Sequence, residues 1–110
     1  MKKIEAYIRP EKLNDLIDIL ESLGLKELSL SEIKNYNFKQ IDPRTDYFDI
    51  DKLKRKIKVE LIINYNEVDK FVDAIKKAAN TGNFGDGKIF VYDIENAVRI
   101  RTGEEGVKAL

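Results

Sequence analysis

The segment from Thr81 to Lys88, Thr-Gly-Asn-Phe-Gly-Asp-Gly-Lys, has the residue types that bind an anion. Closely spaced glycines let successive backbone N–H groups turn toward one ligand, and the ammonium of Lys88 adds a positive charge. The segment follows a predicted helix and enters a predicted strand, whereas Walker and dinucleotide-binding loops run from a strand into a helix. The residues alone therefore favour a tight turn over a ligand site, and both alternatives stay open.

Two arginines, Arg99 and Arg101, lie two positions apart near the end of the chain. If residues 97–101 form a strand, alternation puts both guanidinium groups on one face, beside the face that carries Lys58 and Glu60. Paired guanidinium groups suit a phosphate or a carboxylate because their donors form a planar fork. The alternative, which each arginine taken singly favours, is a solvated strand face.

Residues 37–55 form a polar segment that is too long for a hairpin turn, and long loops in compact domains are usually functional or disordered. The segment lacks the glycine and the closing glutamate of an EF-hand calcium loop, so we predict no metal site there. Phe38, Tyr47 and Phe48 are aromatic side chains in polar surroundings, which is typical of anchors for a partner protein. The alternative is that they fold back on the body of the protein.

The overall composition excludes several classes of function. The 110-residue chain has 20 Lys and Arg against 20 Asp and Glu, which argues against nucleic-acid binding through overall charge. It has no cysteine and no histidine, which excludes thiol nucleophiles, Cys/His zinc sites and the commonest general base. No apolar run approaches the roughly 20 residues of a membrane span, and the first residues lack the apolar core of a signal peptide. We expect one cytoplasmic domain over residues 1–110, with no catalytic residues and no membrane insertion.

Hydrophobic periodicity predicts the elements that position these residues. Residues 3–9 alternate as a half-buried strand, and residues 11–23 have helical spacing. Residues 27–36 form a second strand, with a bulge or an exit from the sheet where the apolar parity slips at Ile33. The second half repeats this order, with a strand at 57–63, a helix over 67–79 capped by Asn66, a strand at 88–94 and a short fifth strand at 97–101. The predicted fold class is α+β, a ferredoxin-like β-α-β-β-α-β sandwich with a long loop between its second and third strands.

The predicted strand at 88–94 is apolar on both of its faces, with Ile89 and Val91 on one face and Phe90 and Tyr92 on the other. A sheet with helices on one face leaves the second face open, so this strand needs a second cover. We expect oligomerisation through the open face, because a lone domain of this size has a small core. The alternative is an ordinary edge strand covered by the chain's own tail.

Long strings of this sequence resemble the P-II signal-transduction (nitrogen regulatory) family. They are Met1-Lys-Lys-Ile-Glu-Ala-Tyr-Ile-Arg-Pro10, the run from Thr81 to Asp93, and Val98-Arg-Ile-Arg-Thr-Gly-Glu104. The resemblance covers most of the chain and implies a compact homotrimer of ferredoxin-like subunits. It also implies that ATP or ADP binds in the cleft between neighbouring subunits, so that the turn at 81–88 and the ligand site are one feature.

The resemblance further implies roles for individual positions. It places the loop around the phosphates at residues 85–88, and it implies that arginines at 99 and 101 reach the phosphates from the adjacent chain. The remaining matches line the adenine and ribose pocket. In chain order, the implied nucleotide-binding residues are Ile8, Ser29, Glu60, Ile62, Gly85, Asp86, Gly87, Lys88, Arg99 and Arg101.

The start of the protruding loop departs from the family pattern, which is Gly-x-Gly-(Arg/Lys)-Gln. This chain has Asn35-Tyr-Asn-Phe-Lys-Gln40 there. The family glutamine that helps hold Mg²⁺ and 2-oxoglutarate is therefore either Gln40, displaced by one residue, or lost from this chain. Lys56 matches the lysine that contacts 2-oxoglutarate at the far end of the loop. Tyr47 lies near the position of the family's modified tyrosine but lacks its expected neighbours, so we expect no uridylylation.

The leading hypothesis is a regulatory protein that binds ATP or ADP, with Mg²⁺ accompanying ATP. Its segment 37–55 would control a target protein, a transporter or an enzyme of nitrogen or carbon metabolism. One alternative is a slow ATP hydrolase or phosphotransferase in which Asp86 or Glu60 positions water. The other is a structural trimer that binds no nucleotide.

Overall fold

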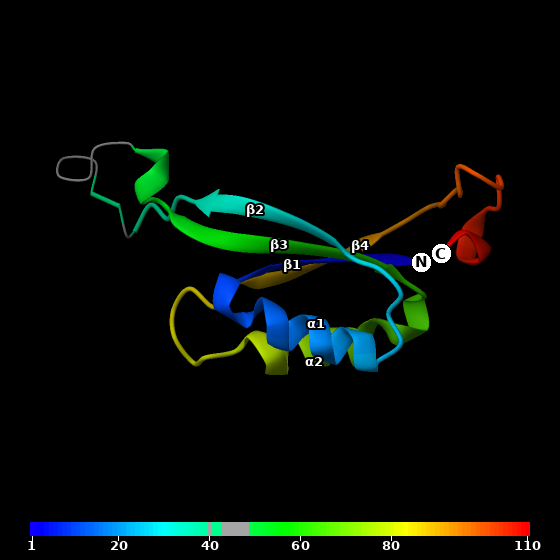
Figure 1. Ribbon diagram of the computed structural model, residues 1–110, viewed down its shortest axis with the longest axis horizontal. Coiled ribbons are helices and arrows are strands. Elements are labelled where there is room, and N and C mark those ends of the chain that lie inside the picture. Colours follow the sequence, from blue (N-terminus) through cyan, green and yellow to red (C-terminus); the bar gives the residue numbers. More distant parts are fainter. Residues whose placement is uncertain (40, 43–48) are drawn as a thin grey trace.

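Four strands form one antiparallel sheet, and two helices cover one of its faces (Figure 1). The computed structural model describes residues 1–39, 41–42 and 49–110. Along the described chain the elements are β1 (Lys2–Ile8), α1 (Leu13–Ser22), β2 (Ser29–Asn35), β3 (Lys54–Ile63), α2 (Val68–Ala79) and β4 (Lys88–Asp93). The spatial order is β2-β3-β1-β4. This arrangement confirms the predicted α+β, ferredoxin-like fold class.

The core lies between the sheet and the helices, where the predicted alternation places it. Ile4, Ala6 and Ile8 of β1 are buried, while the intervening residues face the open side of the sheet. The helices contribute side chains at helical spacing, because one turn returns each apolar position to the same face. The buried residues of β3, α1 and α2 are Ile57, Val59, Leu61, Ile63, Leu16, Leu20, Phe71, Ile75, Ala78 and Ala79.

α1 begins two residues later than the predicted helix at 11–23, and α2 begins one residue later than the predicted helix at 67–79. A 3₁₀ turn over Pro10–Lys12 precedes α1, and another over Tyr65–Glu67 precedes α2. The predicted cap at Asn66 is therefore wrong, because Asn66 lies inside this turn and the residue before α2, Glu67, has helical backbone angles and no side-chain cap. Asp69 in the first turn of α2 still favours the positive end of the helix dipole.

The edge strand β2 is regular along its length. Its pairing with β3 runs from Ser29 opposite Glu60 to Asn35 opposite Lys54 without interruption. The predicted bulge or exit at Ile33 is therefore wrong. Ile33 lies opposite Lys56, and the alternation of β3 places Lys56 on the open face of the sheet. Ile33 therefore also lies on the open face, and the change in apolar parity reflects an apolar residue there.

The predicted fifth strand at 97–101 is also wrong. Residues 94–110 form an arm, in which Val98 and Glu105 make an isolated bridge and a 3₁₀ turn covers Gly106–Ala109. The physical reason is the length of β1. Its pairing with β4 ends at Lys2 opposite Asp93, and the amide of Ile94 donates to Met1 O at 3.2 Å, so no further residue of β1 is left to pair with the arm.

The open face of the sheet carries apolar side chains at its β4 edge. Phe90 is 42% exposed and Tyr92 is 45% exposed.

No helix in the described part of the chain has the length and apolarity needed to cross a membrane. Figure 1 shows the loop that follows α2 at one end of the sheet, while both termini and the C-terminal arm lie at the other.

Candidate functional site

The loop between α2 and β4 passes close to the end of β1 and needs glycine there. Gly85 and Gly87 have φ angles of +93° and +108°, which side-chain-bearing residues rarely adopt. A Cβ atom at Gly87 would lie 1.6 Å from the carbonyl oxygen of Tyr7. The loop is thus pressed against the end of β1, and only glycine fits at this position.

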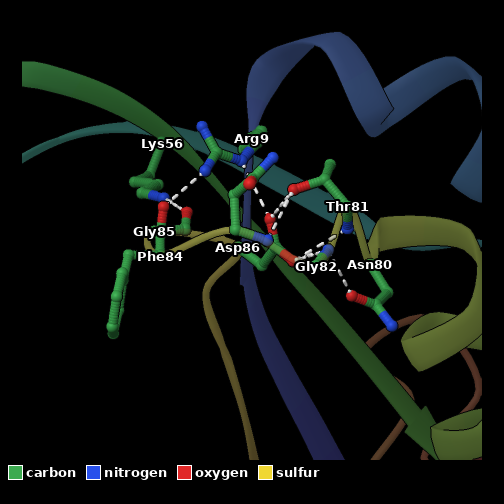
Figure 2. A network of polar contacts seen from close by, with 9 residues as sticks. Arg9, Lys56, Asn80, Thr81, Gly82, Phe84, Gly85 and Asp86 are labelled. Carbon is green, nitrogen blue, oxygen red and sulfur yellow. Dashed lines mark hydrogen bonds and ion pairs between the residues drawn. The ribbon is translucent and has the colours of Figure 1, made fainter.

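The Asp86 carboxylate holds the loop together from inside (Figure 2). It accepts hydrogen bonds from the backbone amides of Thr81 at 2.8 Å and Gly82 at 3.0 Å, and from the hydroxyl of Thr81. The Nε of Arg9 also donates to it at 3.0 Å. The hydrogen bonds from Thr81, reinforced by Arg9 and Gly82, hold the pKa of Asp86 well below its usual range. Asp86 is therefore an ionised organiser of the loop.

Two cationic side chains from outside the loop donate hydrogen bonds to its carbonyl groups. Arg9, which follows β1, donates from Nη2 to the carbonyl of Phe84 at 2.6 Å. Lys56 on β3 donates to the carbonyl of Gly85, and its residue is only 6% exposed. Burial lowers the pKa of Lys56, and the nearby charge of Arg9 adds to this effect. In Figure 2 both side chains converge on the loop from the sheet.

The loop leaves donors available to a ligand. The backbone N–H groups of Gly85 and Asp86 make no hydrogen bond with any described residue. Consecutive free N–H groups beside glycines at positive φ form a concave anion site, and Arg9, Lys56 and Lys88 provide positive charge around it. This donor set suits a phosphate or a carboxylate group.

A pocket of about 430 Å³ adjoins the loop between α2 and β4. Four of the sequence-predicted residues, Ile8, Asp86, Gly87 and Lys88, line this pocket. Its other lining residues include Tyr7 and the C-terminal half of α2, which sequence reasoning did not select. Together with Gly85 of the same loop, five of the ten predicted nucleotide-binding residues therefore lie at one end of the sheet.

Three other predicted residues lie on the open face of the sheet. Ser29 and Glu60 are opposite each other on β2 and β3, and Ile62 follows on the same face. Glu60 makes ion pairs with Lys3 at 2.8 Å and Lys58 at 3.3 Å, and the hydrogen bonds from these lysines lower its pKa. Ile8 points to the helix side, so it does not share a face with this group.

The two arginines of the arm differ from each other. Arg99 donates to the carbonyl of Leu110 at 3.0 Å, so it ties the end of the chain to the arm. Arg101 makes no hydrogen bond or ion pair with a described residue. The arm that contains them lies at the opposite end of the sheet from the loop at 81–88 (Figure 1). Within one chain they are not brought to the anion site.

The predicted partner segment lies partly outside the described residues. Phe38 is 87% exposed, and its ring lies 4.9 Å from that of Tyr36. Gln40, Tyr47 and Phe48 fall on residues that the structure does not describe. Among the residues it does describe, no three acidic side chains gather in a way that could hold a metal ion.

Comparison with known proteins identifies the family. The sequence matches the family described as nitrogen regulatory protein P-II over residues 1–104. The chain belongs to this family. The P-II resemblance read from the sequence is therefore confirmed.

Curated P-II relatives match along their full length. The nitrogen regulatory protein P-II of Bradyrhizobium diazoefficiens is 42% identical over 114 aligned residues, and that of Rhodospirillum rubrum is 43% identical over 113. Each alignment covers the whole of both chains. Nitrogen regulatory protein P-II 1 of Methanothermobacter thermautotrophicus is 41% identical over 113 residues, which span the whole of this chain and 97% of the relative. The chain is thus a P-II-type regulatory protein.

Arg9 is the residue of this P-II protein that sequence reasoning missed. In the sequence Arg9 is only the last residue of the predicted strand at 3–9, whereas in the structure it holds both Asp86 and the carbonyl of Phe84. The available signal was a charged residue directly before Pro10, where β1 ends. This signal does not predict which residue Arg9 contacts, because Arg9 and Asp86 are 77 positions apart in the sequence.

Proposed function

We propose that this P-II protein is a homotrimer that binds ATP or ADP between subunits and regulates a target protein through residues 37–55. Residues 1–110 then act as one functional domain. The cytoplasmic location expected from the sequence stays a prediction.

The observation that carries this proposal is the anion site at the end of the sheet. The free N–H groups of Gly85 and Asp86 and the ammonium of Lys88 suit a polyphosphate, because each is a hydrogen-bond donor and none is an acceptor. Arg9 and Lys56 add charge from the sheet side. A nucleotide bound here would place its phosphates at this loop.

The separation of the remaining residues supports a site built from more than one subunit. Ser29, Glu60 and Ile62 lie on the open face, and Arg101 lies at the far end of the chain without a partner among the described residues. A second copy is needed to bring Arg101 to the phosphate loop of the first. The exposed Phe90 and Tyr92 on the open face supply apolar area for that assembly.

The ligand roles at Lys56 and Gln40 extend the proposal to 2-oxoglutarate. Lys56 is a buried cation beside Arg9 and an uncommitted N–H pair, which suits a carboxylate. Gln40 is outside the described residues, and its role rests on the family resemblance. Mg²⁺, if bound, would be held together with the ATP phosphates and would neutralise their charge.

Regulation requires that the ligand favour one arrangement of residues 37–55 over another. The segment is joined to the anion site through β3, because Lys56 lies two residues after the start of that strand and bonds the phosphate loop. Exposed Phe38 provides an aromatic contact for a protein target. The target is a transporter or a metabolic enzyme.

Isothermal titration calorimetry and light scattering test the proposal together. We expect a trimeric mass, saturable heat with ATP and with ADP, and a change in nucleotide affinity when 2-oxoglutarate is added. Absence of heat with any adenine nucleotide would favour the structural trimer. A monomer at all concentrations would contradict the shared site.

The positions of the Asp86 and Glu60 carboxylates do not support the alternative that the protein is an ATP hydrolase. Asp86 is committed to Thr81, Gly82 and Arg9, and Glu60 is paired with two lysines, so neither is available to position a water molecule. We propose binding without turnover. Steady-state phosphate release at many turnovers per minute would overturn this part of the proposal.

A further inference from the structure

We propose that the pocket between α2 and β4 receives Ile100 from the C-terminal arm of a second copy of this chain. The inference rests on the proposed assembly of copies and specifies a contact within it. It gives the arm an apolar anchor next to the site that its arginine would complete.

The pocket is open and apolar at the edge of the sheet. Val72, Ile75 and Ala79 of α2 form one wall and Ile89 of β4 forms another, with Lys76 beside them. β4 is the edge strand of the sheet, so within the described part of the chain no further strand pairs with this side. An apolar cavity of about 430 Å³ beside an edge strand is a site for an apolar side chain.

The tip of the arm presents such a side chain. Ile100 is 101% exposed, although it is β-branched and fully apolar. The backbone around it is held in place, since the amide of Arg99 donates to Glu104 O at 2.8 Å and that of Gly103 donates to Arg99 O at 2.7 Å. Arg99 further ties this tip to the carbonyl of Leu110. A well-bonded turn that holds an apolar residue in solvent is prepared for contact with another surface.

The chain cannot fill the pocket with its own arm. The pocket lies where Lys88 pairs with Tyr7, and the arm leaves the sheet where Asp93 pairs with Lys2. These points are five residues of β4 apart, which is about 17 Å along the strand, and the arm continues away from the sheet (Figure 1). Ile100 can therefore reach the pocket only on another copy.

The neighbouring charges explain why a second copy fits better than an unrelated apolar peptide. Arg101 directly follows Ile100, and the pocket adjoins the anion site at Gly87 and Lys88. Seating Ile100 would bring the guanidinium toward the phosphates bound there. Without an anion, Arg101 would face Lys88 and Lys56, so the bound phosphate and the arm contact support each other.

Cysteine crosslinking tests the contact directly, because the chain contains no cysteine. We expect the double variant Ile100→Cys/Lys76→Cys, treated with a short bismaleimide, to give covalent dimers and trimers on a denaturing gel. The reaction is run with and without ADP. The matched control is Ile100→Cys/Asp18→Cys, whose second cysteine lies on the exposed side of α1, outside the pocket, and it should stay monomeric on the gel. Absence of the Ile100–Lys76 link in both conditions, or equal linking in the control, would overturn the inference.

A second variant measures the importance of the contact. Ile100→Asp should weaken assembly about tenfold or more, whereas Ile100→Leu should assemble normally. Because Ile100 is exposed in the chain, neither substitution should change the circular dichroism of the subunit. Unchanged assembly of Ile100→Asp would overturn the inference.

The outcomes separate this inference from the proposed function. A trimer that binds ATP but gives no Ile100–Lys76 link contradicts the pocket contact and leaves the function in place. A link in a protein that binds no nucleotide supports the contact and contradicts the nucleotide site.

Discussion

Asp86 holds the shape of the loop at 81–88, and Asp86→Asn tests whether this shape supports the proposed nucleotide binding. If its charge merely lay near the phosphates, removing it would strengthen nucleotide binding by reducing repulsion. Because the carboxylate binds Thr81, Gly82 and Arg9, we expect weaker binding by calorimetry. Asp93→Asn is the control, since Asp93 pairs with Lys2 at the far end of β4 and should not change the affinity. Tighter binding by Asp86→Asn would contradict the role.

The same variant has a pH signature. The pKa of Asp86 is lowered in the folded protein by its hydrogen bonds from Thr81, so the ionised form stabilises the fold above the ordinary aspartate pKa. As the pH falls below about 4, this contribution is lost. The difference in unfolding free energy between the wild type and Asp86→Asn should therefore be largest near neutrality and shrink in acid. Urea denaturation over a range of pH values measures it.

Gly87 can be compared with Gly82, which has a similar positive φ but no atom within 4 Å of the position that a Cβ atom would occupy. Gly82→Ala should add only left-handed strain, about 1–2 kcal/mol. Gly87→Ala should lower the free energy of unfolding by more than this, because its Cβ would overlap the carbonyl of Tyr7 and force β1 and β4 to shift. Urea denaturation compares the two variants, and equal effects would show that the strand contact is not limiting.

The sequence indicates local backbone features more directly than contacts between distant residues. The residue types alone favoured a tight turn at 81–88, and Gly82, Gly85 and Gly87 have the positive φ angles of such a turn, whereas the phosphate role of this loop rests on the family resemblance. Arg9 was not identified, because its partners Phe84 and Asp86 are set by how β1 meets β4. Such tertiary pairings have no local pattern.

Among the elements, the strands and helices with a covered face were predictable and the arm was not. In α2 the apolar positions Phe71 and Ile75 repeat at helical spacing, and both are buried. In residues 97–101 the alternation is present, but a strand also needs a neighbour, and β1 ends before it could supply one. Periodicity reports which face is apolar, and it does not report whether a pairing edge is available.

Arg99 and Arg101 of the arm differ in their contacts, so we expect their substitutions to have different effects. Arg101→Ala should weaken nucleotide binding by about 1.5–3 kcal/mol without changing subunit stability, because Arg101 has no partner among the described residues. Arg99→Ala should also loosen the tail, since Arg99 donates to Leu110 O. Calorimetry gives the affinity, and hydrogen exchange of residues 106–110 gives the order of the tail. An unchanged affinity in Arg101→Ala would indicate a solvated side chain.

The segment between β2 and β3 should be dispensable for folding. Asn35 and Lys54 are opposite each other at the end of the β2–β3 ladder, so a two-residue Asn-Gly turn can replace residues 36–53. We expect the shortened protein to retain its circular dichroism and oligomeric mass but to lose its target protein in pull-down experiments. Loss of assembly would mean that the segment is structural.

For the whole molecule, the balanced net charge conceals an uneven distribution. Arg9 and Lys56 meet at the loop at 81–88, and Lys88 begins β4 beside it. Farther along the open face, Glu5 and Glu60 are paired with lysines. Positive charge is therefore concentrated at one end of a neutral chain, where a phosphate group would offset it.

The apolar edge of the open face determines whether copies assemble. Phe90 lies opposite Glu5 in the β1–β4 pairing, and its ring meets that of Tyr7 edge-on at 5.7 Å. Phe90→Glu would place a second carboxylate beside a nearly buried one, on a face that assembly must desolvate. We expect this variant to sediment as a monomer and to bind nucleotide weakly, because Arg101 of another copy no longer reaches the loop. Tyr65→Glu, at an exposed aromatic residue of the turn before α2, is the control and should remain assembled. If Phe90→Glu assembles like the control, the copies do not meet through this face, and the shared site requires a different contact.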